Sequence, residues 1–239
     1  MAQDFLSSSR RSFLKGLTVT TASGIIMPNL LLRAQDTPAS KKLGIACIGV
    51  GGKGFSDMVN ASFENEIVAI CDVDSKALAK AAQKFPNAKQ YKDFRKMFDE
   101  VKNIDAVTVS TPDHSHFPAA MHAIALGKHV MVQKPLVNTL WEADQLHKAA
   151  RKKGIITQMG NQGHTFEENR LLKEWFQANV IGKVSEIHVW TNRPIWPQGK
   201  DVQIAEEAVP EHLDWDLWLG ALPSRPYSKG IAPFAWRGF

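Results

Sequence analysis

A glycine-rich turn between an apolar run and a helical segment constrains the fold of this chain more than any other stretch. The run LGIACIG, residues 43–49, leads into glycines spaced as G-x-G-x-x-G. In this setting the first glycine makes a tight turn, the second lets the backbone approach a pyrophosphate, and the third lets the helix pack on the strand. Free N–H groups and the helix dipole then attract phosphate oxygens. We therefore predict a dinucleotide site that includes Gly49, Gly51, Gly52, Lys53 and Gly54.

An acidic residue follows at the distance expected for a ribose site. The segment NEIVAICDVD, residues 65–74, is typical of a second strand, and Asp72 near its end lies 18 residues after Gly54. A carboxylate there can accept both ribose hydroxyls and would repel a 2′-phosphate, which favours NAD over NADP. The alternative is that the glycines form an ordinary turn and that Asp72 caps a helix.

Short apolar segments alternate with helical ones as far as residue 160. Strands are predicted within 43–49, 65–74, 104–112, 129–136 and 154–160, and helices within 74–85, 118–129 and 140–153. Thr139 and Glu142 form a capping box at the start of the last helix, and Gly154 ends it. This alternation predicts an α/β fold, a Rossmann doubly wound parallel sheet with helices on both faces, over residues 43–160.

The pattern changes over residues 161–239. Residues 166–182 have the spacing of an amphipathic helix, residues 183–194 alternate like a half-exposed strand, and a Trp- and Pro-rich stretch follows to Phe239. We expect an incomplete α/β (α+β) substrate domain, and expect the chain to be the front part of a longer protein. The tryptophans at 190, 196, 215, 218 and 236 are expected mostly in core packing, with stacking on sugars as the alternative.

The N-terminus is similar to an export signal of the twin-arginine pathway. The stretch SSRRSFLKG, residues 8–16, contains Arg10 and Arg11, and a moderately apolar segment of residues 16–32 follows. That segment is too short and too polar for a stable membrane anchor. We predict a signal peptide over residues 1–34 and a linker over 35–42, with the twin-arginine translocase as a partner and a periplasmic or otherwise exported location. A basic N-terminus without this role is the alternative.

Charge and cysteine content exclude two further classes of site. The net charge of +5 is concentrated in the predicted signal peptide, so no basic patch remains to suggest a nucleic-acid partner. Cys47 and Cys71 lie in apolar strands and are expected to be small buried hydrophobes. The sequence does not decide whether they form a disulfide, because that depends on the distance and orientation of their Cβ atoms. Neither cysteine has a second ligand at metal spacing, so we predict no metal site.

Two polar stretches follow predicted strands at the sheet edge where ligands bind. In TPDHSH, residues 111–116, Asp113 or Ser115 is expected to cap a helix and His114 to be a surface residue. In VQKPL, residues 132–136, Lys134 is expected to point into the crevice, where burial or a nearby nicotinamide cation would lower its pKa. An exposed loop lysine is the alternative.

Taken together, GIACIGVGGKG, VAICDVD, STPDHSHFPAAMHAIALGKHVMVQKPL, GNQGH and IGKVSEIHVW resemble the Gfo/Idh/MocA oxidoreductases. The resemblance implies a Rossmann domain followed by an α/β domain whose open sheet covers the nicotinamide. It also implies that Lys134 hydrogen-bonds the substrate hydroxyl and that the bond before Pro135 is cis. The cofactor would be lined by Thr111, Pro112, His116, Gln133 and Lys134, and the substrate side by Gln162 and His164.

Two departures from the family qualify this resemblance. First, Gln133 stands where the family has a glutamate, and the loss of that carboxylate would make Lys134 a readier base. Second, the family's downstream aspartate and histidine have no counterpart before Phe239. The leading hypothesis is an exported NAD-dependent oxidoreductase acting on a sugar or polyol. The alternatives are an NAD-dependent glycoside hydrolase that oxidises its sugar transiently, and a non-catalytic nucleotide-binding fragment. Self-association is left open.

Overall fold

The computed structural model describes residues 42–192 and 205–238 of the 239-residue chain. The predicted signal peptide, all of the linker except Lys42, and Trp196 lie outside the described residues.

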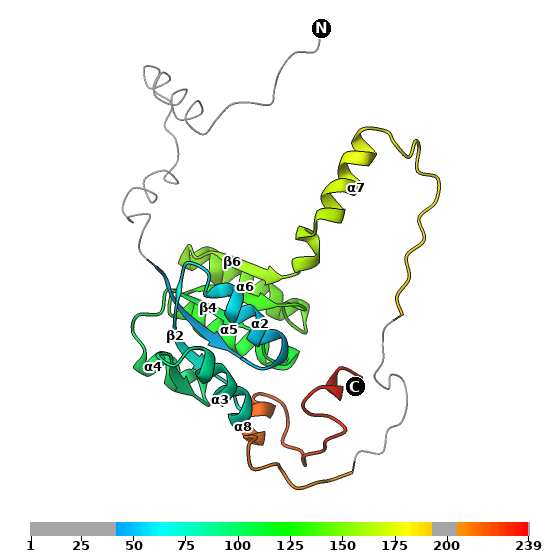
Figure 1. Ribbon diagram of the computed structural model, residues 1–239. Coiled ribbons are helices and arrows are strands. Elements are labelled where there is room, and N and C mark those ends of the chain that lie inside the picture. Colours follow the sequence, from blue (N-terminus) through cyan, green and yellow to red (C-terminus); the bar gives the residue numbers. More distant parts are fainter. Residues whose placement is uncertain (1–41, 193–204, 239) are drawn as a thin grey trace, which may run out of the picture. The chain divides into compact units, whose positions relative to one another are not determined.

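Six parallel strands form one sheet in the order β3-β2-β1-β4-β5-β6 (Figure 1). They are β1 (Gly44–Ile48), β2 (Glu66–Cys71), β3 (Lys89–Tyr91), β4 (Ala106–Val109), β5 (His129–Gln133) and β6 (Thr157–Gly160). The chain progresses outward in one direction from β1 to β3 and in the other from β4 to β6. This reversal creates a crevice at the carboxyl ends of β1 and β4, where ligands bind in such folds. The predicted Rossmann sheet is confirmed.

Five helices connect these strands: α2 (Gly52–Ala61), α3 (Ser75–Lys84), α4 (Phe94–Glu100), α5 (His116–Ala125) and α6 (Leu140–Lys153). The predicted ends of α6 are confirmed. Thr139 accepts a hydrogen bond from the Glu142 backbone while the Glu142 side chain accepts from the Thr139 backbone, and Gly154 ends the helix at φ 63°. These local hydrogen bonds satisfy groups that the helix itself leaves unpaired.

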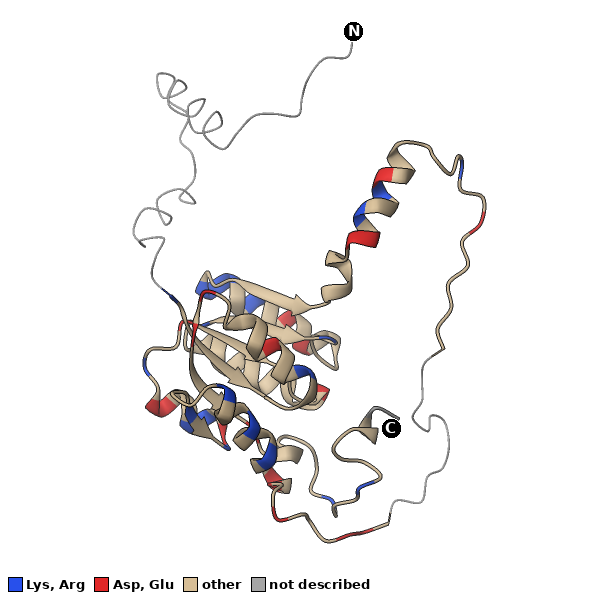
Figure 2. Ribbon diagram, in the orientation of Figure 1, with Lys and Arg blue, Asp and Glu red and all other residues tan. Residues whose placement is uncertain are grey.

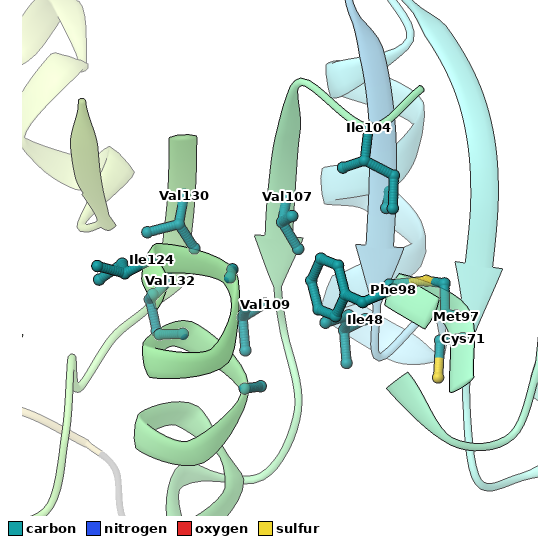
Figure 3. Packing of buried hydrophobic residues seen from close by; sticks show 14 of the residues in the cluster. Ile48, Cys71, Met97, Phe98, Ile104, Val107, Val109, Ile124, Val130 and Val132 are labelled. Atoms are coloured by element: carbon teal, nitrogen blue, oxygen red, sulfur yellow. The ribbon is translucent and has the colours of Figure 1, made fainter. Parts of the chain in front are cut away.

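The helices divide between the two faces of the sheet, and each face has its own apolar core. Met58 of α2 and Leu78 of α3 pack with Cys47 on one face. On the other face α4, α5 and α6 pack with Cys71, and Figure 3 shows Met97 and Phe98 there beside Ile48. The two cysteines are therefore buried and free on opposite faces of the sheet, and burial raises the pKa of the Cys47 thiol to about 12.

Beyond β6 the chain forms a 3-10 turn (Gln162–Thr165) and the helix α7 (Glu167–Gln177), which agrees with the predicted amphipathic helix. Along α7 two acidic residues in the first turn are followed by the basic Arg170 and Lys173 and then by Glu174 (Figure 2). The predicted strand over 183–194 was wrong for the part that is described, because residues 183–192 form no strand. Alternation favours a strand only when a neighbouring strand offers backbone partners, and no described strand pairs with this segment. None of the described helices has the length and apolar character to cross a bilayer.

A third cluster belongs to the C-terminal part of the described chain. The short helix α8 (Trp215–Leu219) begins at Asp214, whose side chain accepts a hydrogen bond from the Leu217 backbone. The rings of Trp215 and Trp218 stack with centroids 4.7 Å apart, and both residues are buried. The expectation of core packing is confirmed for these two tryptophans, whereas Trp190 is 84% exposed.

Candidate cofactor site

The glycine turn is built by close backbone contacts that leave no room for side chains. Gly49 follows β1 with φ 78°, and a Cβ atom there would lie 2.7 Å from the backbone of Ser110, directly after β4. Gly54, in the first turn of α2, would place a Cβ atom against the carbonyl oxygen of Gly49. The turn after β1, the start of α2 and the turn after β4 are thus packed backbone to backbone.

Asp72 organises this turn from the end of β2. Its Oδ2 accepts hydrogen bonds from the backbone N–H groups of Val50 and Gly51, over 2.8 and 3.2 Å. Its Oδ1 accepts from the backbone of Asp74, over 2.9 Å. Burial raises the pKa of the Asp72 carboxyl, against the lowering effect of these three donors. The alternative role as a helix cap is wrong, because Asp74 caps α3.

A cavity of about 500 Å³ lies over this turn. The predicted cofactor residues that line it are Gly49, Gly51, Gly52, Lys53, Asp72, Thr111 and Pro112. Thr111 Oγ1 is buried and has no hydrogen-bond partner in the described part of the chain. A volume in the usual range for ligand sites, glycines that admit a close ligand and an unsatisfied hydroxyl all fit a dinucleotide.

His116 lies behind this cavity rather than on its wall. It is fully buried, and its two ring nitrogens lie 2.7 Å from the Pro135 carbonyl oxygen and 2.9 Å from that of Thr111. The imidazole therefore ties the turn after β4 to the cis Lys134–Pro135 bond. The resemblance placed it at the cofactor, and the structure gives it a bridging position instead.

His114 is not the surface residue that the sequence suggested. Its Nε2 donates a hydrogen bond to the Trp218 carbonyl over 2.7 Å, and the two rings lie 4.8 Å apart. Burial lowers the pKa of His114, and the carbonyl acceptor at Nε2 places the proton of the neutral ring on that nitrogen.

One buried carboxylate was missed by the sequence analysis. Asp57 on α2 is 5% exposed, and its Oδ2 accepts hydrogen bonds from the Ser110 hydroxyl and from Gln133 Nε2, both over 2.8 Å. Its Oδ1 pairs with the Lys53 ammonium group. The i, i+4 spacing of Lys53 and Asp57 was the only local signal of this network. Gln133 is thus directed at Asp57 and does not line the cavity.

Lys134 is exposed, so the expectation that it points into a buried crevice was wrong. It follows β5 at the sheet edge, where nothing in the described chain encloses it. The parallel register pairs Gln133 with Gly160, so Gln162 and His164 follow β6 beside it. Both are exposed and neither lines the cavity. The structure brings these three residues to one edge of the sheet, and their roles stay predictions.

Residues 43–161 match the family model described as "Oxidoreductase family, NAD-binding Rossmann fold", Gfo/Idh/MocA. D-glucoside 3-dehydrogenase of Escherichia coli (strain K12) is 31% identical over 166 residues, which are 67% of this chain and 46% of that protein. Glycosyl hydrolase family 109 protein 1 of Shewanella sp. (strain MR-4) is 29% identical over 212 residues, covering 75% of this chain and 46% of that protein.

Among solved structures, myo-inositol 2-dehydrogenase from Lactobacillus plantarum matches with a TM-score of 0.56 and 28% identity. The match covers 60% of this chain and 43% of that one. The chain spans about half the length of the curated relatives that it matches.

Proposed function

Since the domain of residues 43–161 belongs to the Gfo/Idh/MocA family of NAD-binding oxidoreductases, we propose that the protein oxidises or reduces a sugar or polyol hydroxyl with NAD. The observation that carries this proposal is the cavity itself, in which the glycine turn, Asp72 and Thr111 meet. The relatives named as glucoside and inositol dehydrogenases support a substrate rich in hydroxyl groups.

The residues around the cavity divide the work of holding the dinucleotide. The backbone N–H groups at the start of α2 bind the pyrophosphate, and Asp72 accepts the hydroxyls of the adenosine ribose. Bound NAD would supply the redox partner for the carbinol carbon of the substrate. Lys134 hydrogen-bonds the substrate hydroxyl and takes or returns its proton, and Gln162 and His164 bind the remainder of the substrate.

A second candidate function is redox-assisted glycoside hydrolysis, which the similarity to a family 109 glycosyl hydrolase favours. One assay separates the two. The protein is incubated with NAD and a panel of polyols, free sugars and aryl glycosides, while NADH absorbance and released products are followed together. NADH accumulation supports the oxidoreductase, and aglycone release without net NADH supports the hydrolase. If the protein binds NAD but gives neither NADH nor a released aglycone, both candidate functions are contradicted and a nucleotide-binding role is left.

We propose that the protein is exported in folded form with NAD already bound, because the cofactor is made in the cytoplasm. The SSRRSFLKG stretch supports this location. The test is to recover the exported protein, denature it and assay the released nucleotide. Unimpaired export after Arg10 and Arg11 are both changed to lysine would contradict it.

Asp72 should set the preference for NAD. The Asp72→Ser variant is expected to bind NAD roughly tenfold or more weakly, because a hydrogen bond to a charged group is lost, and to narrow the gap to NADP. Dissociation constants for both nucleotides, measured by calorimetry, check this. The Asp72→Asn variant is the control, since it retains an acceptor for the Val50 and Gly51 backbone but removes the charge. A native protein that prefers NADP would contradict the assignment.

Lys134 should act in turnover and not in cofactor binding. Lys134 is exposed at the sheet edge and lies outside the cavity wall. Because the side chain takes or returns the substrate proton in the proposed reaction, Lys134→Ala is expected to lower kcat by roughly a hundredfold or more. Its NAD affinity should stay within about threefold of the native value, since a residue without cofactor contacts adds little to binding. The exposed Lys152→Ala variant is the matched control. Unchanged kcat would remove Lys134 from the mechanism.

A further inference from the structure

The C-terminal segment of residues 212–236, which we call the strap, is attached to the turn that carries Asp72. The Ser75 backbone donates a hydrogen bond to the His212 carbonyl over 2.8 Å, and the Asp214 backbone donates to the Val73 carbonyl over 3.0 Å. Asp74 and Leu213 form an isolated antiparallel bridge between these two bonds. The strap is thus held by main-chain bonds next to the proposed ribose site.

A second anchor holds the strap to the turn after β4. His114 donates to the Trp218 carbonyl and its ring packs against the Trp218 indole. Because β1 lies between β2 and β4 in the sheet, the two anchors flank the glycine turn that follows β1.

The strap is a packed unit, so it can act as a defined wall. Trp215 stacks on Trp218, contacts Tyr227 edge-on with centroids 5.2 Å apart, and donates from its indole to the Arg225 carbonyl over 2.7 Å. Tyr227 and Ile231 are buried in the same cluster.

One side of the strap lines the cofactor cavity. Its contribution is mainly apolar and consists of Leu213, Leu217, Trp218, Pro233, Phe234 and Trp236. Across the same cavity lie Val73, Phe94 and Pro112 of the Rossmann domain. With the pyrophosphate on the glycine turn and the ribose on Asp72, the adenine must occupy this apolar part of the cavity, because the ribose joins it to the rest of the dinucleotide.

We propose that the strap binds the adenine of NAD and slows the release of the cofactor. The inference rests on the proposed function, because it requires NAD in the cavity. Aromatic and aliphatic side chains on both sides of the flat adenine ring would remove it from water. The anchors at Ser75 and His114 must both open before the adenosine half can leave.

The test compares two ligands in the full chain. The protein is loaded with NADH or with reduced nicotinamide mononucleotide, which lacks the adenosine half. Excess NAD is then added, and the loss of fluorescence from the bound reduced nucleotide is followed over time to give its release rate. Leu217→Ala is expected to release NADH about five- to tenfold faster, since it removes apolar contact with the adenine. Release of the mononucleotide should not change. Leu222→Ala, on the same strap but away from this cavity, is the matched control.

A second variant, His114→Ala, removes an anchor without touching the cavity wall and should also accelerate NADH release. Equal NADH release rates in the native protein and both variants would overturn the proposal, as would an equal acceleration for the mononucleotide. Native protein that binds no NADH at all would instead overturn the proposed function.

Discussion

Replacing Gln133 with glutamate, the residue that the family's motif carries, should lower the free energy of unfolding by about 3 kcal/mol at pH 7. The Gln133 amide donates to Asp57 Oδ2 over 2.8 Å, and the two residues are only 6% and 5% exposed. A second carboxylate at that distance removes the donor and sets two negative charges together away from water. The hydrogen bond to Asp57 therefore accounts for an amide at position 133, and the effect of this departure on the basicity of Lys134 stays a prediction.

Urea unfolding at several pH values tests this expectation. The deficit of Gln133→Glu should shrink as the pH falls toward about 4, where an unfolded glutamate begins to take up its proton. Adding Asp57→Asn to Gln133→Glu restores one donor and one acceptor and should recover most of the loss. Gln133→Met, which removes the donor without adding charge, should cost about 1–2 kcal/mol with little pH dependence. A deficit of Gln133→Glu that is independent of pH would point to packing against Gly160, which Gln133 contacts closely.

The Gly54→Ala variant should lose about 3 kcal/mol or more of stability, together with NAD binding. The added methyl group would overlap the carbonyl oxygen of Gly49, and this contact is with backbone and not with a flexible side chain. To relieve it, α2 must move away from the turn after β1, which disperses the N–H groups that would bind the pyrophosphate. Denaturant unfolding and NAD titration by calorimetry measure the two effects.

Gly52→Ala is the matched control for this effect. Gly52 has φ 48°, but a Cβ atom there would meet nothing within 4 Å. Its cost should be only the left-handed backbone penalty of about 1 kcal/mol. Equal losses of stability in the two variants would contradict the close-packing explanation for Gly54.

Elements with local signals were predictable from the sequence. The capping box at Thr139 and the terminal Gly154 are set by residues within one helix, and the glycine spacing with Asp72 depends on a single βαβ unit. The strand β3 was missed because it has only three residues, and the helix α4 was missed because its short sequence consists mostly of charged residues. Tertiary packing forms α4 by burying Met97 and Phe98.

The parts of the site that sequence reasoning missed depend on contacts between distant residues. Asp57 meets Ser110 and Gln133 across separations of 53 and 76 residues, and His114 meets Trp218 across 104. Residue patterns within a single helix or strand carry no information about side-chain contacts between residues so far apart in the sequence. The described part of the alternating segment, residues 183–192, is the converse case, since a favourable local pattern forms no strand there without a neighbouring strand.

The two cysteines are buried on opposite faces of the sheet, so each thiol senses the packing of a different helix layer. Cys47 does not line the cofactor cavity, so its thiol can be modified only when its own layer opens, whereas Cys71 also lines that cavity. With the cavity filled by cofactor, each thiol becomes a built-in reporter of local opening. Cys47 reports the layer of α2 and α3, and Cys71 the layer of α4, α5 and α6. The rates at which a thiol reagent labels the two positions would therefore separate the opening free energies of two layers that global unfolding measures only together.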